Sequence, residues 1–269
     1  MKTRILVSIP LLALMATMIY VRTLPFYIII VAFMILSQYE VFMAMRNASF
    51  KPCVWTCFAF ALLLYPTHIF FGFNGVFYLF TILNIINLVW AIFLPNRQFI
   101  DIMVSMFVMF YPAIPLYFLI LIGDMESVEL SRIAMAMALI IPVASDTAAY
   151  FIGKFFGKHK LSPMISPNKT VEGAIGGFIL CQLVIIPVYI IAFNLNVIQG
   201  VRIIPLIICS AICGIFAQLG DLIASAVKRY SGIKDFGHIF PGHGGILDRI
   251  DSIIFCAVAV YTYFKIFAP

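Results

Sequence analysis

Acidic and basic side chains gather near the C-terminal end of a chain that has 17 Lys and Arg and 11 Asp and Glu among its 269 residues. If Asp221, Ser225 and Lys228 lie on one helix, their spacing of i, i+4 and i+7 places them on one face. Asp248 and Asp251 are one helical turn apart and converge in the same way if a helix begins near them. Carboxylate oxygens are the ligands that Mg²⁺ prefers, so these acids indicate metal-assisted chemistry.

Four basic side chains accompany these acids: Lys228, Arg229, Lys234 and Arg249. Cations grouped in this way neutralise anionic ligands, and Arg binds phosphate oxygens in pairs. The acids and bases together therefore fit a cradle for metal ions and phosphates. The alternative is a charge-balanced, solvated loop between two membrane helices, and spacing alone does not decide between the two.

The residue types of this stretch follow a recognisable order: Ser225, Lys228, Arg229, Lys234, Asp235, Gly237, Pro241, His243, Gly244, Gly245, Asp248, Arg249 and Asp251. This order resembles the signature of phosphatidate cytidylyltransferases, also called CDP-diacylglycerol synthases. The resemblance implies an enzyme that converts CTP and phosphatidic acid into CDP-diacylglycerol and pyrophosphate. It also implies that Asp221, Asp248 and Asp251 hold Mg²⁺, with a second cation left open, and that Lys228 acts in catalysis.

The other members of this stretch are expected to bind the substrates: Ser225, Arg229, Lys234, Asp235, His243, Gly244, Gly245 and Arg249. The cations would hold phosphate groups, and the glycines around His243 would let the backbone approach a ligand closely. His243 itself is either a substrate-positioning residue or an ordinary turn histidine.

A second stretch resembles the same family more loosely, at Asp146, Ser166, Pro167, Lys169, Thr170, Glu172 and Gly173. Asp146 shares a helix face with Tyr150 and Gly153, at positions i, i+4 and i+7. From the resemblance we expect Asp146, Ser166 and Lys169 to contact a substrate.

A helix start is expected next to this second stretch. Ser166 and Pro167 suit a turn, and Thr170 or Ser166 could cap a helix that begins near Val171. The backbone N–H groups of such a helix start point towards the surface, where they could meet a phosphate.

The elements that must position these residues are membrane helices. The chain is 64% hydrophobic and 10% charged, whereas soluble domains are about 25% charged. Only helices and closed barrels satisfy their backbone in a bilayer, and the apolar runs here do not alternate as barrel strands do. We therefore predict an all-α integral membrane protein with nine spans, at 4–21, 24–45, 52–72, 75–94, 99–122, 131–153, 173–194, 202–227 and 246–267.

These spans divide into two regions. Residues 1–130 carry no chemical motif and are predicted to be scaffold helices. Residues 131–269 form the predicted catalytic region, with the site built mainly from 142–173 and 218–252. Glu40, an acid inside an apolar run, is interpreted as reaching the cytoplasmic interface from the end of the second span.

The distribution of basic residues predicts the orientation. With nine spans and a cytoplasmic N-terminus, 13 of the 17 basic residues face the cytoplasm, and the other side keeps Arg22, Arg132, Arg202 and Lys265. The candidate site then faces the cytoplasm of a multi-pass protein of the cell membrane. The compact length resembles prokaryotic members of the family.

Other classes fit less well. The net charge of +6 is explained by loops that face an anionic leaflet, so no nucleic-acid partner is expected. A secondary transporter that uses Asp146 and Asp221 as ion relays is the main alternative, but the charges cluster at one face and no internal repeat is present. A CDP-alcohol phosphotransferase would need a motif that is missing here. The oligomeric state, a homodimer included, is left open.

Overall fold

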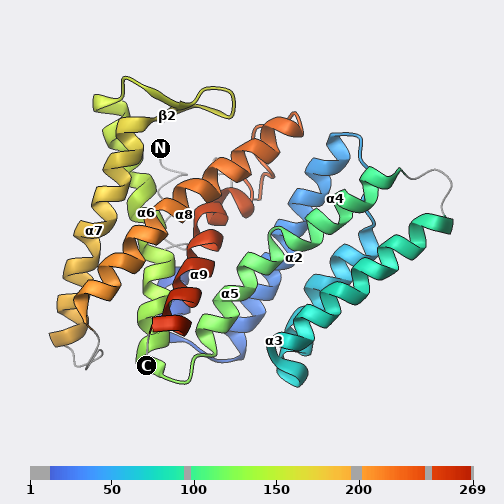
Figure 1. Ribbon diagram of the computed structural model, residues 1–269, viewed down its shortest axis with the longest axis horizontal. Coiled ribbons are helices and arrows are strands. Elements are labelled where there is room, and N and C mark those ends of the chain that lie inside the picture. Colours follow the sequence, from blue (N-terminus) through green and yellow to red (C-terminus); the bar gives the residue numbers. More distant parts are fainter. Residues whose placement is uncertain (1–12, 94–97, 195–201, 240–243, 268–269) are drawn as a thin grey trace.

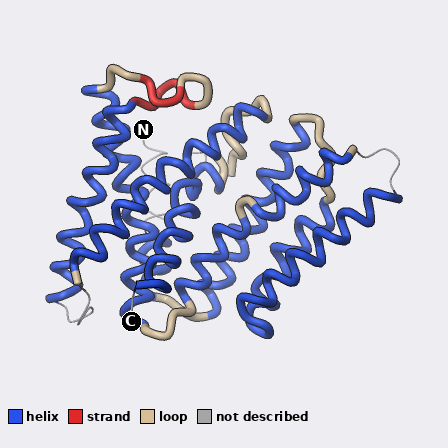
Figure 2. The backbone as a smooth tube through the Cα atoms, in the orientation of Figure 1, coloured by secondary structure: helices blue, strands red, loops and turns tan. Residues whose placement is uncertain are grey.

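The computed structural model describes residues 13–93, 98–194, 202–239 and 244–267, which are almost entirely helical (Figures 1 and 2). Its helices are α2 (Leu24–Asn47), α3 (Val54–Phe93), α4 (Phe99–Phe110), α5 (Ala113–Gly123), α6 (Val128–Phe156), α7 (Val171–Asn194), α8 (Ile203–Tyr230) and α9 (Leu247–Phe267). Within this part of the chain, seven helical segments are long and apolar enough to cross a membrane, with α4 and α5 counted together. The fold class predicted from the sequence, an all-α polytopic membrane protein, is confirmed.

The predicted spans match these helices from the second span onward. Two of them, 52–72 and 75–94, form the single long element α3, which breaks at Gly72, a residue with φ 63° that only glycine adopts freely. The span 99–122 is divided into α4 and α5 at Pro112. Of the first span, residues 13–20 are helical, Val21 is not, and residues 4–12 lie outside the described residues. The count of nine therefore stays a prediction.

The helices that carry the predicted site residues pack together. In Figure 1, α6, α7, α8 and α9 form one group, α3 lies at the opposite edge of the molecule, and α5 packs against both α2 and α9 between them. Glycine allows the closest approaches within the first group. A Cβ on Gly220 of α8 would lie 2.4 Å from the carbonyl oxygen of Asp251 in α9, and one on Gly173 of α7 would lie 2.6 Å from that of Ala149 in α6.

A short hairpin joins α6 to α7, and the sequence did not predict it. Strands β1 (Lys160–Ser162) and β2 (Ser166–Thr170) pair antiparallel and lie beyond the ends of α6 and α7 (Figure 2). Ser166 and Pro167 begin β2, so the turn expected at them is wrong. The expected cap is confirmed, because Thr170 Oγ1 accepts a hydrogen bond from the Gly173 N–H at 3.1 Å. Strands this short carry too little alternation to be recognised in a sequence.

A polar network at the other end of the molecule connects the scaffold helices. His68 Nε2 lies 2.6 Å from Asp124 Oδ2, and its Nδ1 lies 2.7 Å from the hydroxyl of Tyr117. Tyr27 donates a hydrogen bond to the other Asp124 oxygen. Burial raises the pKa of Asp124, but the hydrogen bonds from His68 and Tyr27 and the nearby Arg22 outweigh burial and hold this pKa below its usual range. The network joins α2, α3 and α5.

Acidification is expected to weaken this network. Because the folded-state pKa of Asp124 is depressed, its contribution to stability is fully present above the pKa of an unfolded aspartate, about 4, and is lost as the pH falls through the folded value. The wild-type protein should melt at a higher temperature than Asp124→Asn near neutral pH, and the gap should narrow below about pH 4. Glu126→Gln, a change to an exposed acid in the same loop, is the control. A gap that stays constant with pH would contradict this assignment.

Candidate active site

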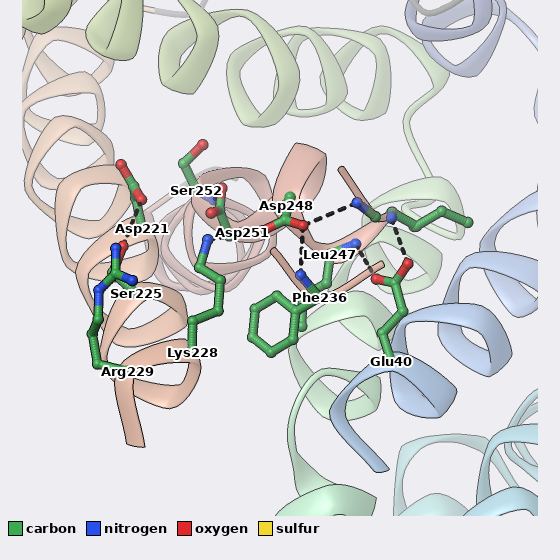
Figure 3. A network of polar contacts seen from close by, with 12 residues as sticks. Glu40, Asp221, Ser225, Lys228, Arg229, Phe236, Leu247, Asp248, Asp251 and Ser252 are labelled. Atoms are coloured by element: carbon green, nitrogen blue, oxygen red, sulfur yellow. Dashed lines mark hydrogen bonds and ion pairs between the residues drawn. The ribbon is translucent and has the colours of Figure 1, made fainter. Parts of the chain in front are cut away.

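The C-terminal half of α8 presents the predicted acid, hydroxyl and base on one side. Ser225 Oγ donates to Asp221 Oδ1 at 3.4 Å. Lys228 Nζ forms an ion pair at 2.7 Å with Asp248 Oδ1 of α9. Figure 3 shows these side chains of α8 facing the first turns of α9, so the shared face predicted from their spacing is present.

Asp248 directs both carboxylate oxygens to protein partners. Oδ1 binds Lys228, and Oδ2 accepts hydrogen bonds from the backbone N–H groups of Phe236 and Gly245, each at 2.9 Å (Figure 3). Its side chain is only 3% exposed. Gly244, with φ +87°, allows the backbone to pass so close that a Cβ there would lie 2.7 Å from Asp248 Oδ2. Asp248 therefore holds the segment between α8 and α9 in place.

Asp251 and Asp146 lie deeper, where α6, α8 and α9 meet. Asp251 is buried, and its Oδ1 accepts a hydrogen bond from the Ser252 N–H at 2.8 Å. The Ser252 hydroxyl donates to Asp146 Oδ2 at 2.8 Å and so connects α9 to α6. Asp221 of α8 lines the same cavity as Asp146. Carboxylates from α6, α8 and α9 thus share one region. Acids within membrane helices are costly and commonly mark a functional site.

A cavity of about 420 Å³ opens beside these acids, between α6, α7, α8 and the hairpin. Its lining combines four charged residues with polar and apolar ones. The charged residues are Asp146, Lys154, Lys169 and Asp221, and the others include Asn168, Gln218, Tyr150 and Gly153. Its volume lies within the range of about 300–1,000 Å³ that is typical of ligand pockets. Lys169 Nζ reaches Asp221 Oδ2 at 2.6 Å, and the two side chains remain 25% and 27% exposed. This is where the second predicted stretch meets the first.

The remaining predicted residues lie around this centre. Arg229 donates from Nε to the Ile165 carbonyl oxygen at 3.2 Å and so ties the end of α8 to the hairpin. Lys234, Asp235 and Arg249 are exposed on the surface. Ser166 is the first residue of β2 and does not line the cavity. The prediction for His243 falls outside the described residues.

Glu40 contacts the candidate site through the start of α9, and the sequence interpretation missed this contact. It is 3% exposed, and its two carboxylate oxygens accept hydrogen bonds from the Ile246 and Leu247 N–H groups at 2.9 and 2.8 Å (Figure 3). Glu40 therefore does not end at an exposed surface, and its depth relative to the membrane interface stays a prediction. An isolated acid in an apolar run was the only available signal, and it did not indicate the partner.

The predicted metal ligands can be tested against this geometry. Among the described residues, no group of three or more His, Cys, Asp and Glu is placed to hold a metal ion. Asp248 is engaged as described above, which leaves Asp221 and Asp251. Mg²⁺ is commonly bound by one or two carboxylates plus substrate phosphates, rather than by a complete protein cage. Asp221 lines the cavity and fits that arrangement, whereas Asp251 is buried and is not among the lining residues. The predicted set of three does not gather around one point in the described part of the chain.

Comparison with known proteins agrees with the resemblance. A family model described as "Cytidylyltransferase family" matches residues 2–267. Curated proteins named phosphatidate cytidylyltransferase are similar to this chain: one from Staphylococcus haemolyticus is 50% identical over 120 residues, one from Staphylococcus aureus strain COL is 50% identical over 122, and one from Staphylococcus saprophyticus is 49% identical over 118. Each alignment covers 44% of this chain and 44% of the relative, so less than half of each relative's length is matched.

Proposed function

This chain belongs to the cytidylyltransferase family, and we propose that it transfers the cytidylyl group of CTP to phosphatidic acid, forming CDP-diacylglycerol and pyrophosphate. The names of the similar staphylococcal proteins support the choice of the lipid substrate. The observation that carries the proposal is the cavity that brings Asp146, Lys169 and Asp221 together beside α9. A polyanionic nucleotide and an anionic lipid both need such paired charges at the membrane surface.

The reaction needs charge cancellation and alignment more than it needs a base. The lipid phosphate is already largely ionised at neutral pH, because the second pKa of a phosphomonoester is about 6. One of its oxygens attacks the α-phosphorus of CTP, a new P–O bond forms, and the bond from the α-phosphorus to the bridging oxygen of the β-phosphate breaks. Pyrophosphate leaves with that electron pair. The protein must hold two anions in line while this happens.

The chain's cations would hold those anions. Lys169 now pairs with Asp221 in the cavity, and a phosphate oxygen could take the place of that carboxylate. Arg229, Lys234 and Arg249 are exposed at the same end of the molecule and would meet the triphosphate as it arrives from water. Lys228 is committed to Asp248, so we assign it to positioning α9 rather than to the phosphates.

Asp221 and Asp251 are the residues that would hold Mg²⁺ together with substrate oxygens. Bound there, the metal would neutralise charge on the reacting phosphates and fix their orientation. Asp146, hydrogen-bonded to Ser252, would keep the α6 side of the site fixed next to α9.

Lipid access is proposed to be lateral. Phosphatidic acid must keep its acyl chains in hydrocarbon, because each CH₂ moved into water costs about 0.8 kcal/mol. The cavity that contains Asp146 and Asp221 lies between membrane helices α6, α7 and α8 and is also lined by Tyr150 and Leu161. A lipid could therefore enter between the helices while CTP enters from water near Lys234.

Lys158 and Lys234 are expected to face the cytoplasm together. The hydrogen bond from Arg229 to Ile165 places the hairpin and the end of α8 at one end of the molecule. Single reporter cysteines at both positions should be labelled from the same side of sealed vesicles, in a background that lacks the native cysteines, all of which are buried. A reporter at Glu126 is the control for the opposite side. Opposite accessibility of Lys158 and Lys234 would show that a span between them is miscounted.

The proposed activity is tested by following label from [α-³²P]CTP into lipid with the purified protein, phosphatidic acid and a titration of Mg²⁺. Labelled CDP-diacylglycerol should form in proportion to protein and should require both the lipid and the metal. Diacylglycerol in place of phosphatidic acid is the matched control, because it lacks the attacking phosphate. Transport of an ion or solute without any lipid product would instead favour the transporter alternative.

A further inference from the structure

Glu40 connects the scaffold helices to the candidate active site. It lies on α2, yet its carboxylate contacts the start of α9 about two hundred residues later in the chain, at Ile246 and Leu247. None of the ion pairs found among the described residues includes Glu40. Its partner is therefore the N-terminal end of a helix, where free N–H groups and the helix dipole favour a negative charge.

The surrounding backbone is shaped around this carboxylate. A Cβ on Gly245 would lie 2.3 Å from Glu40 Oε1, and one on Gly237 would lie 2.6 Å from the same atom. Both glycines belong to the segment between α8 and α9, so two separate parts of that segment close on Glu40. Asp248 closes the same segment from the other side through the N–H groups of Phe236 and Gly245.

We propose that Glu40 is a positioning residue for cytidylyl transfer: its carboxylate fixes the first turn of α9 and thereby sets Asp248 and Asp251 against α8. The inference rests on the proposed function for its kinetic consequences, but its structural content does not. Glu40 is not among the residues that line the cavity, so it acts through α9 and not on a substrate.

Both oxygens of the carboxylate are needed. Two N–H donors approach Glu40, and glutamine can offer only one acceptor oxygen while its NH₂ group would face a donor. Glu40→Gln therefore leaves one buried N–H without a partner and removes the charge that complements the helix end. The first turn of α9 should shift, and a displacement of about 1 Å in a catalytic group can cost on the order of a hundredfold in rate.

Gln38 provides a matched control on the same helix. It is fully buried, and its Nε2 donates to the Val108 carbonyl oxygen of α4 at 3.0 Å, so it joins α2 to another scaffold helix and not to α9. Gln38→Ala removes a buried hydrogen bond of α2 as Glu40→Gln does, but away from the site. Any loss that comes only from a weakened scaffold should appear in both variants.

The experiment compares kcat, KM for CTP and thermal midpoint for the wild type, Glu40→Gln, Glu40→Asp and Gln38→Ala. Glu40→Gln should lower kcat on the order of a hundredfold, with little change in KM for CTP, because the exposed cations remain in place. Gln38→Ala should lower the melting temperature but keep kcat. Glu40→Asp, which keeps the charge on a shorter arm, should recover part of the lost rate. It also gives the same comparison if the glutamine variant does not fold.

Hydrogen exchange supplies a readout that does not depend on activity. Amides from Gly245 to Ser252 should exchange faster in Glu40→Gln than in the wild type, and they should be unchanged in Gln38→Ala. Equal kcat losses in the two variants, or unchanged exchange at the start of α9, would overturn the proposal. If the wild-type protein makes no CDP-diacylglycerol, the proposed function fails, but the exchange result still decides the role of Glu40.

Discussion

Asp251→Asn is expected to lose turnover by about a hundredfold to a thousandfold, the scale seen when one preorganised charge-stabilising group is removed from an active site. Asparagine keeps the shape of the side chain but removes the anionic oxygen that we assign to Mg²⁺. Asp251 is buried and shares its surroundings with Asp221 and Asp146. Removing one of three crowded acids should relieve repulsion, so the variant should melt no lower than the wild type.

The measurement is the rate of CDP-diacylglycerol formation over a Mg²⁺ titration, together with the melting temperature. Asp101→Asn is the matched control, because Asp101 is a buried acid of α4 whose oxygens accept N–H groups of Lys51 and Gln98. That variant should lose stability and keep turnover. Normal activity of Asp251→Asn at every Mg²⁺ concentration would reject the metal assignment.

Breaking the Lys228–Asp248 pair is expected to cost stability as well as activity. The two side chains are 12% and 3% exposed and lie 2.7 Å apart, and removing one partner of a buried pair costs about 3–5 kcal/mol because the other charge stays buried alone. Lys228→Met and Asp248→Asn should each lower the melting temperature strongly. The double variant should be less destabilised than the two losses added together, but it should stay inactive because Asp248 no longer holds Phe236 and Gly245.

The Lys169–Asp221 pair provides a comparison with these Lys228 and Asp248 variants, because it is more exposed. Its side chains are 25% and 27% exposed, and exposed ion pairs contribute at most about 1 kcal/mol. Lys169→Met should therefore lose activity with little change in melting temperature. Two results would contradict this distinction between a buried structural pair and an exposed substrate-facing pair. One is a stability loss in the Lys228–Asp248 double variant that equals the sum of the two single losses. The other is a stability loss in Lys169→Met as large as that in Lys228→Met.

Sequence reasoning succeeded where the information is local. The apolar runs predicted the helices, and helical spacing placed Asp221 and Ser225 on one face. Both predictions depend only on residues that are close together in the sequence. It failed where the partner lies far along the chain. Nothing near Glu40 indicates Ile246, and nothing near Asp248 shows that one of its oxygens pairs with Lys228 while the other accepts backbone N–H groups. The distinction between a metal ligand and an acid that holds a loop therefore needed the structure.

The bond from α2 to α9 has a consequence for biosynthesis. Glu40 enters the bilayer early during translation, whereas Ile246 and Leu247 are made about two hundred residues later. Until then the nascent chain carries a carboxylate whose final partners do not yet exist, and a charge in hydrocarbon is costly. Insertion of α2 should remain shallow or reversible until α9 arrives and pairs with it. Completion of the site and stable insertion of an early helix would then occur together, because a chain that ends before α9 leaves the Glu40 carboxylate without these two donors.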